Sequence, residues 1–288
     1  MDANLARRVG FAAVAIPVAL GVVWYGGLPL AFLLALAGAL GTRELFGLAA
    51  HQGVRPAQTM GLVTSAVVAP VIYATLAAPD VRAWAQPAWP YLAAVWLMAL
   101  LTWALVFRAP AERPLEAAAV TLLAVMYTSV LPAFLLVIRH SSFPERSWAA
   151  AWLVFFPLVV TWVCDTAAMF GGRLLGGPKL APRISPGKTR SGAAAGVIGA
   201  LIVAPIFTTA VFPRVGVAAS LAQLLVMAAV LSVIGQVGDL AESLFKREAG
   251  VKDSSQLIPG HGGVLDRFDS LYFVIPAAAA MYRLFGII

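Results

Sequence analysis

The hydrophobic residues of this chain fall in long runs that are separated by short polar connections. A helix that crosses a membrane needs about 20 predominantly apolar residues, and nine runs reach or approach that length. They cover residues 10–26, 28–49, 59–78, 89–107, 116–138, 149–171, 192–212, 217–240 and 268–286. The pattern therefore predicts an all-α polytopic membrane protein with about nine transmembrane helices.

Composition leaves little room for anything besides these helices. Of the 288 residues, 61% are hydrophobic, whereas about half of the residues of a soluble domain are apolar. The mean hydropathy is +0.89, so the chain is strongly apolar overall. We expect a single transmembrane domain over residues 1–288. Two polar connections, 164–192 and 235–270, are unlike the others in length and in their charged residues. They are the candidates for catalytic segments.

The formal net charge of +7 is explained by where the basic residues fall. With nine spans, fifteen of the 20 lysines and arginines lie in connections on one side of the membrane, and five lie on the other. Because basic connections stay in the cytoplasm, we expect a cytoplasmic N-terminus, an external C-terminus and both candidate segments on the cytoplasmic face. The charge thus reflects topology and gives no support to nucleic acid as a partner.

The first apolar run follows Arg7 and Arg8, an arrangement that also occurs in secretory signals. Here another apolar run follows at once, without a polar mature segment between them. We therefore interpret the first run as a retained span.

Asp239 is an acidic residue at the end of an apolar run, and Glu242, Ser243 and Lys246 follow three, four and seven residues later. On a helix these four side chains share one stripe. A carboxylate at that depth is costly unless it faces a polar cavity or a cation. Two interpretations stay open: a ligand site, or a helix end whose charges reach the lipid headgroups, with Asp239 interacting with Lys246.

A glycine-rich loop follows, in which glycines, Gly262 and Gly263 among them, surround His261. Backbone N–H groups of such a loop can approach a phosphate closely, although a short flexible connection has the same composition. Asp266 and Asp269 then precede the last apolar run, where carboxylates also serve as helix caps. Carboxylate oxygens without cysteine suit Mg²⁺, which completes its shell with water and substrate phosphate. The sequence therefore predicts a magnesium site and a phosphorylated substrate.

The other candidate segment combines the acidic end of a span with a basic, glycine-rich connection. Asp165 ends an apolar run, and Ser185, Lys188 and Thr189 stand in a turn restrained by proline and glycine. The cations of this connection can simply enforce topology, but these three side chains also suit a polyphosphate cradle. At the end of the second run, we interpret Glu44 as the partner of a neighbouring anchoring arginine rather than as a wall of the site.

The stretch "SLFKREAGVKDSSQLIPGHGGVLDRFD", from Ser243 to Asp269, resembles the signature of the phosphatidate cytidylyltransferases, or CDP-diacylglycerol synthases. The matching positions are Ser243, Lys246, Arg247, Lys252, Asp253, Pro259, Gly260, His261, Gly262, Gly263, Asp266, Arg267 and Asp269. A second block of the family is similar to the first candidate segment, through Asp165, Gly172, Lys179, Pro182, Ser185, Pro186, Lys188 and Thr189. Ser255 and Gln256 stand where members often have Gly and Asn, which bears on substrate placement rather than on the reaction.

This resemblance implies an enzyme of phospholipid biosynthesis that transfers the cytidylyl group of CTP to phosphatidic acid, giving CDP-diacylglycerol and pyrophosphate. It also implies a requirement for Mg²⁺ with a second cation, K⁺, and a homodimer. The implied location is the bacterial inner membrane, with many spans in the lipid bilayer and the active site facing the cytoplasm.

From the chemistry of the residues together with this resemblance, we predict the following roles. The metal ligands are Asp239 and Asp266, with Asp269 and Glu242 as lesser contributors. The lipid phosphate and the leaving pyrophosphate are neutralised by Lys246, Arg247, Lys252 and Arg267, while CTP is bound by Ser185, Lys188 and Thr189. Further substrate-binding candidates are Asp165, Ser243, Asp253, Gly262 and Gly263. His261 either protonates the leaving group or shapes the loop.

Two other functions stay open from the residues alone. A CTP-dependent polyprenol or lipid kinase would share the nucleotide and metal sites but would release CDP instead of pyrophosphate. An ion or phospholipid transporter would use carboxylates near the membrane midplane. Against a transporter, the polar residues here cluster at the predicted cytoplasmic ends of the spans.

Overall fold

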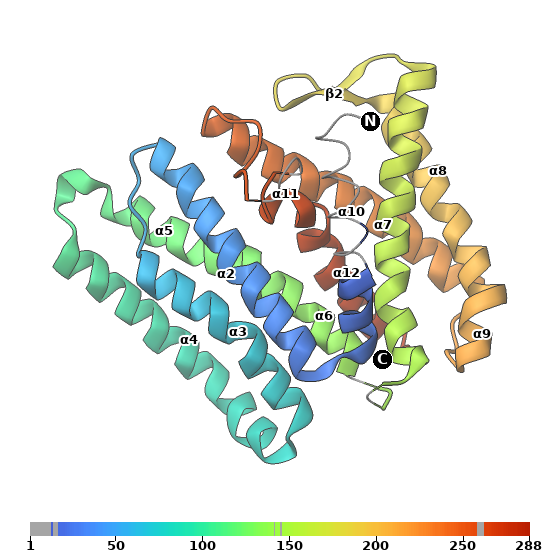
Figure 1. Ribbon diagram of the computed structural model, residues 1–288, viewed down its shortest axis with the longest axis horizontal. Helices are drawn as coiled ribbons and strands as arrows, with labels where there is room; N and C mark the ends of the chain where they lie inside the picture. The colour runs from blue at the N-terminus through green and yellow to red at the C-terminus, as the bar shows by residue number, and fades with distance from the viewer. Residues whose placement is uncertain (1–12, 14–16, 141, 145, 258–261) are drawn as a thin grey trace. The chain divides into compact units, whose positions relative to one another are not determined.

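The computed structural model describes residues 13, 17–140, 142–144, 146–257 and 262–288. The chain divides into two compact units (Figure 1). The first unit comprises Met1–Leu136 and Glu248–Arg267, and the second unit comprises Val137–Arg247 and Phe268–Ile288. The predicted catalytic segment 235–270 is therefore divided between the two units, whereas the segment 164–192 belongs to the second unit alone.

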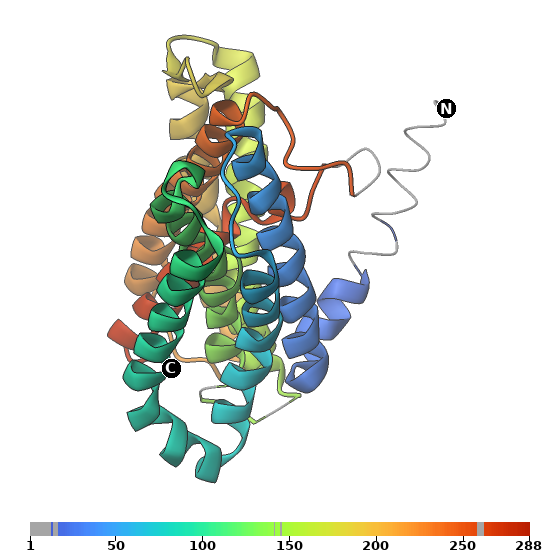
Figure 2. The same ribbon diagram turned by 90° about the vertical axis from the view of Figure 1, so that its left-hand side faces the viewer.

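The first unit is built from consecutive helices that lie side by side (Figures 1 and 2). Their bounds are α2 Gly27–His51, α3 Gln58–Ala77, α4 Pro79–Phe107, the short η1 Pro110–Glu112, α5 Pro114–Val125, the π-helical η2 Met126–Val130 and α6 Leu131–His140, whose last residues belong to the second unit. Buried hydroxyl groups join three of them, because Thr42 Oγ1 on α2 lies 2.6 Å from Ser65 Oγ on α3 and 2.7 Å from Thr128 Oγ1 on η2. Such paired hydroxyls stabilise contacts between helices in a membrane.

The second unit has two long helices in close contact, α7 Trp148–Leu175 and α8 Arg190–Ile206, joined by a small hairpin. The remaining elements are η3 Phe207–Val211, α9 Phe212–Val215, α10 Leu221–Glu248, α11 Leu265–Phe268, which begins in the first unit, and α12 Leu271–Leu284. Glycines permit the close approach of α7 and α8: a Cβ atom added to Gly196 would lie 3.0 Å from Cys164 Sγ and 3.2 Å from Ala168 Cβ. Small residues at such contacts are the usual means by which membrane helices pack.

The hairpin consists of β1 Lys179–Ala181 and β2 Ser185–Thr189, which pair antiparallel with Lys179 opposite Thr189 and Ala181 opposite Ser185. It extends from the ends of α7 and α8 (Figure 1). Thr189 then caps α8, because its Oγ1 accepts a hydrogen bond of 3.0 Å from the N–H of Gly192, as N-cap threonines do. The sequence analysis expected a restrained turn here, so these strands are an addition to the predicted all-α fold.

Seven helices within the described ranges are long and apolar enough to cross a membrane. They are α2, α3, α4, the continuous stretch Pro110–His140, α7, the stretch Arg190–Val211 and α10, and each coincides with one of the nine predicted runs. Of the other two runs, 10–26 lies partly outside the described residues, with residues 17–25 helical. The last run forms α12, whose 14 residues are fewer than the about 20 that span a bilayer unaided.

Candidate active site

A pocket of about 560 Å³ lies in the second unit, among α7, the hairpin, α8 and α10. Its charged lining residues include Asp165 from α7, Lys188 from β2 and Asp239 from α10, and Thr189 and Gln236 also line it. Four residues that the sequence analysis proposed for substrate or metal binding, Asp165, Lys188, Thr189 and Asp239, are thus brought together. They come from three segments that are far apart in the chain.

An ion pair crosses this pocket. Lys188 Nζ lies 2.5 Å from Asp239 Oδ2, and each side chain keeps about a quarter of its surface exposed, 28% for Lys188 and 27% for Asp239. The other carboxylate oxygen, Asp239 Oδ1, accepts a hydrogen bond of 3.3 Å from Ser243 Oγ, one helical turn later on α10. Asp239 is therefore held by a cation and a hydroxyl while it remains open to the pocket.

Carboxylates crowd this region. Asp165, Asp239 and Asp269 lie near enough to one another for their charges to interact. Asp269 stands between α11 and α12, at the start of the last predicted apolar run, where the negative charge of Asp239 acts on its carboxylate. The backbone N–H of Ser270 donates a hydrogen bond of 2.6 Å to Asp269 Oδ1, and the positive charges of Lys246 and Lys188 partly offset the repulsion between the carboxylates. Mutually repelling carboxylates of this kind attract cations.

The stripe predicted on α10 exists, but its pairing differs from the expected one. Lys246 Nζ lies 3.0 Å from Glu242 Oε1, and both side chains are buried. Asp239 pairs with Lys188 instead of Lys246. The predicted pairing of Asp239 with Lys246 is therefore wrong, and the choice between a ligand site and a helix end at the headgroups stays open. The part of Glu242 as a metal ligand stays a prediction, and the buried ammonium group already neutralises its carboxylate.

In the first unit, Glu44 on α2 holds the loop that leads to Asp266. Its Oε1 accepts hydrogen bonds from Ser255 Oγ at 2.7 Å and from Val264 N at 3.0 Å. Its Oε2 accepts hydrogen bonds from Ser254 Oγ at 3.1 Å and from Leu265 N at 2.7 Å. Glu44 is buried, and the sequence analysis interpreted it only as a partner of the adjacent arginine. That interpretation is incomplete, because this carboxylate binds both ends of the loop between Ser254 and Leu265. We call this part of the family signature the signature loop.

Asp266 also stabilises this loop. Its Oδ2 accepts hydrogen bonds from Ser254 N at 2.9 Å, Ser254 Oγ at 2.7 Å and Gly263 N at 2.8 Å. Gly262 has a φ of 79°, and a Cβ atom added there would lie 2.6 Å from Asp266 Oδ2. The backbone at Gly262 therefore requires glycine both for its conformation and for the space. A metal ion bound by Asp266 would share the carboxylate with these donors.

The remaining predicted residues that the structure describes belong to one unit or the other. Lys252, Asp253 and Arg267 are exposed residues of the first unit. In the second unit, Ser185 begins β2, and Arg247 Nε donates a hydrogen bond of 3.1 Å to the carbonyl oxygen of Ile184 in the hairpin. His261 lies outside the described residues. Across the described part of the chain, no three His, Cys, Asp or Glu side chains are arranged as a ready metal site.

The fold and the site together define a multi-pass membrane protein with a charged pocket of about 560 Å³ in its second unit. The profile of the Cytidylyltransferase family matches residues 6–285. The chain therefore belongs to this family, as its signature residues predicted.

Relatives of the chain carry a more specific name. The phosphatidate cytidylyltransferase of Brucella suis biovar 1 is 52% identical over 139 residues, which are 47% of this chain and 47% of the relative. The phosphatidate cytidylyltransferase of Haemophilus influenzae is 39% identical over 163 residues, 54% of this chain and 55% of the relative. The phosphatidate cytidylyltransferase of Bacillus subtilis is 46% identical over 134 residues, which are 46% of this chain and 48% of the relative. The chain thus spans about half the length of the curated relatives it matches.

Proposed function

We propose that this chain is a phosphatidate cytidylyltransferase of phospholipid biosynthesis, which converts CTP and phosphatidic acid into CDP-diacylglycerol and pyrophosphate. Family membership supports a cytidylyl transfer, and the name shared by the relatives supports phosphatidate as the acceptor. The observation that carries the proposal is the pocket in which Lys188 and Thr189 stand beside Asp239 and Asp165. A cationic side chain beside carboxylates is what a metal-bound nucleotide requires.

The chemistry needs little from the protein beyond positioning. A phosphate oxygen of phosphatidate forms a bond to the α-phosphorus of CTP, and the bond from that phosphorus to the oxygen bridging to the β-phosphorus breaks. Pyrophosphate leaves with the electron pair of the broken bond. Since the lipid supplies the nucleophile, no serine or cysteine nucleophile is required, and the chain's single cysteine, Cys164, is buried. Catalysis then rests on bringing two polyanions together and on neutralising their charge.

The residues of the second unit suit these tasks. Lys188, held by Asp239 at the pocket, would neutralise the phosphates of CTP. Gly176, Gly177 and Gly187 also line the pocket and would let backbone N–H groups approach these phosphates. Lys246 and Arg247 would serve the lipid phosphate and the leaving group. In the first unit, we assign the neutralisation of the lipid phosphate and the leaving pyrophosphate to Lys252 and Arg267 as well. Both residues are exposed and flank the loop that Glu44 holds.

Mg²⁺, which this family generally uses, would supply further neutralisation of the nucleotide phosphates when bound. The carboxylates of Asp239 and Asp269, which repel each other, supply only oxygen donors, as such an ion prefers. We assign it to Asp239 with Asp269, and Asp266 stays the second principal ligand predicted from the signature. A second cation, K⁺, rests on the resemblance alone.

We also propose the finer topology: about nine spans, an N-terminus in the cytoplasm, an external C-terminus and a bacterial inner membrane with the pocket on the cytoplasmic side. The distribution of lysine and arginine supports this orientation. A homodimer completes the proposal by family resemblance. Reporter fusions to the two termini test the orientation.

The reaction is tested with the full chain in detergent, CTP labelled on its α-phosphate, phosphatidate and Mg²⁺. We expect label in a liponucleotide and one pyrophosphate released for each molecule formed. We expect Asp239→Asn and Lys188→Met each to lower kcat by about 100-fold or more, the usual cost of removing one preorganised charge partner. Asp80→Asn, which changes an exposed carboxylate at the start of α4, is the matched control and should keep full activity.

Each other outcome has a distinct meaning. Transfer of the γ-phosphate with release of CDP would identify a lipid kinase. Lipid or ion flux without consumption of CTP would identify a transporter. Liponucleotide formation at the normal rate by Asp239→Asn would leave the reaction in place but would overturn the assignment of this pocket.

A further inference from the structure

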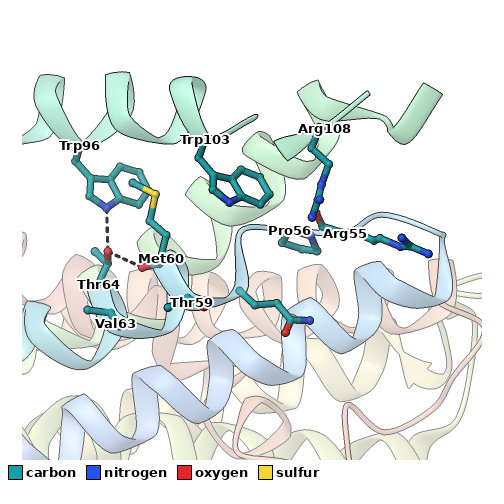
Figure 3. A pocket seen from close by; sticks show the side chains of 10 residues that line it. Arg55, Pro56, Thr59, Met60, Val63, Thr64, Trp96, Trp103 and Arg108 are labelled. Carbon is teal, nitrogen blue, oxygen red and sulfur yellow. Dashed lines mark hydrogen bonds between the residues drawn. The ribbon is translucent and has the colours of Figure 1, made fainter. Parts of the chain in front are cut away.

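A second pocket, of about 800 Å³, lies in the first unit between α3 and α4. Figure 3 shows two tryptophans of α4, Trp96 and Trp103, along one wall and two arginines, Arg55 and Arg108, at one end. Met60 and Val63 of α3 are among the other lining residues. None of these residues has a part in the proposed cytidylyl transfer.

The apolar wall is held in place. Trp96 and Trp103 stand seven residues apart and so share a face of α4, and both pack with Met60 against the buried cluster that includes Leu100. Trp96 Nε1 donates a hydrogen bond of 2.8 Å to Thr64 Oγ1, which donates one of 2.8 Å to the carbonyl oxygen of Met60. The indole donor is therefore satisfied within the protein, and the ring presents a preformed apolar surface.

The end of the pocket with Arg55 and Arg108 carries positive charge that protein carboxylates neutralise only weakly. Arg108 donates from Nε and Nη2 to the carbonyl oxygen of Arg55, at 3.3 Å and 3.0 Å, and its guanidinium lies 4.6 Å from the ring centroid of Trp103. Within the described ranges, no carboxylate pairs with Arg108. Arg55 has Glu112 at 3.9 Å, but the Arg55 side chain is 77% exposed, so this pair is weak. Two positive charges thus stand beside an aromatic wall.

The dimensions of the pocket fit one leaflet of a bilayer. Twelve residues separate Trp96 from Arg108, which is about 18 Å along a helix, and half of a bilayer's hydrocarbon core is about 15 Å. Helices α3 and α4 are also poorly covered by protein, with 17% and 11% of their apolar windows buried. With α4 across a bilayer, Trp96 and Trp103 would stand at the level of the acyl chains, and Arg108, directly after the last residue of α4, would stand at the level of the lipid phosphates.

We propose that this pocket binds a phospholipid with an anionic headgroup, whose phosphate lies against Arg55 and Arg108 and one of whose acyl chains lies along Trp103 and Trp96. Charge complementarity selects this occupant. A second copy of the chain fits less well, because a two-fold axis along the membrane normal places identical residues at the same depth. The arginines of both copies would then lie at one level of the interface, and like charges repel.

The proposal is tested with the full chain in phosphatidylcholine nanodiscs that contain phosphatidylglycerol with brominated acyl chains, which quench tryptophan fluorescence on contact. We expect stronger quenching by brominated phosphatidylglycerol than by brominated phosphatidylcholine at equal mole fraction. The variant Trp103→Phe should lose much of the difference. In Arg55→Gln/Arg108→Gln the preference for the anionic lipid should fall about tenfold or more, since each basic residue near a membrane surface strengthens anionic-lipid binding several-fold.

Two further variants separate charge from folding. Arg55→Lys/Arg108→Lys keeps both charges and should keep the preference. Arg82→Gln removes an arginine from the other end of α4, which likewise donates to backbone carbonyl oxygens, at 3.0 Å and 2.8 Å, and should leave the preference unchanged. Equal quenching by the two lipids, or an intact preference in the double glutamine variant, would overturn the proposal. Disulfide-linked dimers of Val63→Cys that form regardless of lipid would assign the pocket to a second copy.

Discussion

Replacement of Glu44 by glutamine should release the signature loop while leaving the shape of the side chain almost unchanged. The carboxylate accepts hydrogen bonds from the Ser255 hydroxyl and from the backbone N–H groups of Val264 and Leu265, and it shares the single proton of the Ser254 hydroxyl with Asp266. Each carboxylate oxygen faces one serine hydroxyl and one backbone N–H group. Glutamine replaces one oxygen with an NH₂ group, and in either orientation this group faces a backbone N–H. Two donors then oppose each other in a buried site.

The magnitude follows from these contacts. A hydrogen bond to a charged acceptor contributes about 1.5–3 kcal/mol, and a buried donor left without an acceptor costs about 1–3 kcal/mol. One backbone donor loses its acceptor in the variant, while the hydroxyl on the same side can turn to accept from the new NH₂ group. We expect the closed loop to lose about 2–4 kcal/mol of stability. Since about 1.4 kcal/mol is a factor of ten, the population of open loop should rise roughly 30- to 1,000-fold.

Hydrogen exchange measures this population directly. The amides of Val264 and Leu265 should exchange faster by that factor in Glu44→Gln, and liponucleotide synthesis should fall because Asp266 and Arg267 follow directly in the chain. Glu116→Gln is the matched control, since Glu116 forms a half-exposed pair with Arg113, which contributes less than about 1 kcal/mol. Unchanged exchange at Val264 and Leu265 in Glu44→Gln would show that the carboxylate does not hold the loop.

Two glycine substitutions give further predictions. In Gly263→Ala, the new Cβ would overlap Glu44 Oε2 and Ser254 Oγ, so we expect a loss of about 1–3 kcal/mol in thermal unfolding, with faster exchange in the loop. In Gly192→Ala, the Cβ would lie 2.7 Å from the carbonyl oxygen of Ala168, so we expect a similar loss and a raised KM for CTP, measured by steady-state kinetics. Gly47→Ala has no heavy atom within 4 Å of its Cβ and should be neutral or stabilising by up to about 1 kcal/mol; a comparable loss there would contradict both predictions.

The membrane helices could be predicted because their signal is local. Each apolar run of sufficient length must satisfy its backbone hydrogen bonds internally, so a helix follows from composition alone. The bounds were less accurate where polar residues continue a helix: α4 begins at Pro79, ten residues before the predicted run, and α10 continues to Glu248. The hairpin was missed because its five-residue strand contains Pro186 and Gly187, residues that are depleted in strands.

The candidate site was predicted less completely because its pairings join distant segments. The stripe on α10 followed from helical spacing, but the spacing also favours Glu242 with Lys246, an i, i+4 pair in the preferred order, over Asp239 with Lys246. Asp239 pairs instead with Lys188, which nothing local indicates. Glu44 was underestimated because a neighbouring arginine offered a simple partner. The signal that could have identified it is the rule applied to Asp239: a carboxylate within an apolar run needs a specific partner.

The position of Lys188 depends on residues that have no chemistry of their own. Lys188 immediately precedes Thr189, whose Oγ1 caps α8 and would lie only 2.9 Å from a Cβ atom at Gly172. We expect a larger residue at Gly172 to displace this cap and so to disturb the position of the adjacent Lys188. Because a shift of about 1 Å in a positioned group can lower a rate by about 100-fold, packing between α7 and α8 sets the chemistry of the pocket. The glycines that let these two apolar helices approach each other are therefore as necessary for the proposed reaction as the charged residues they position.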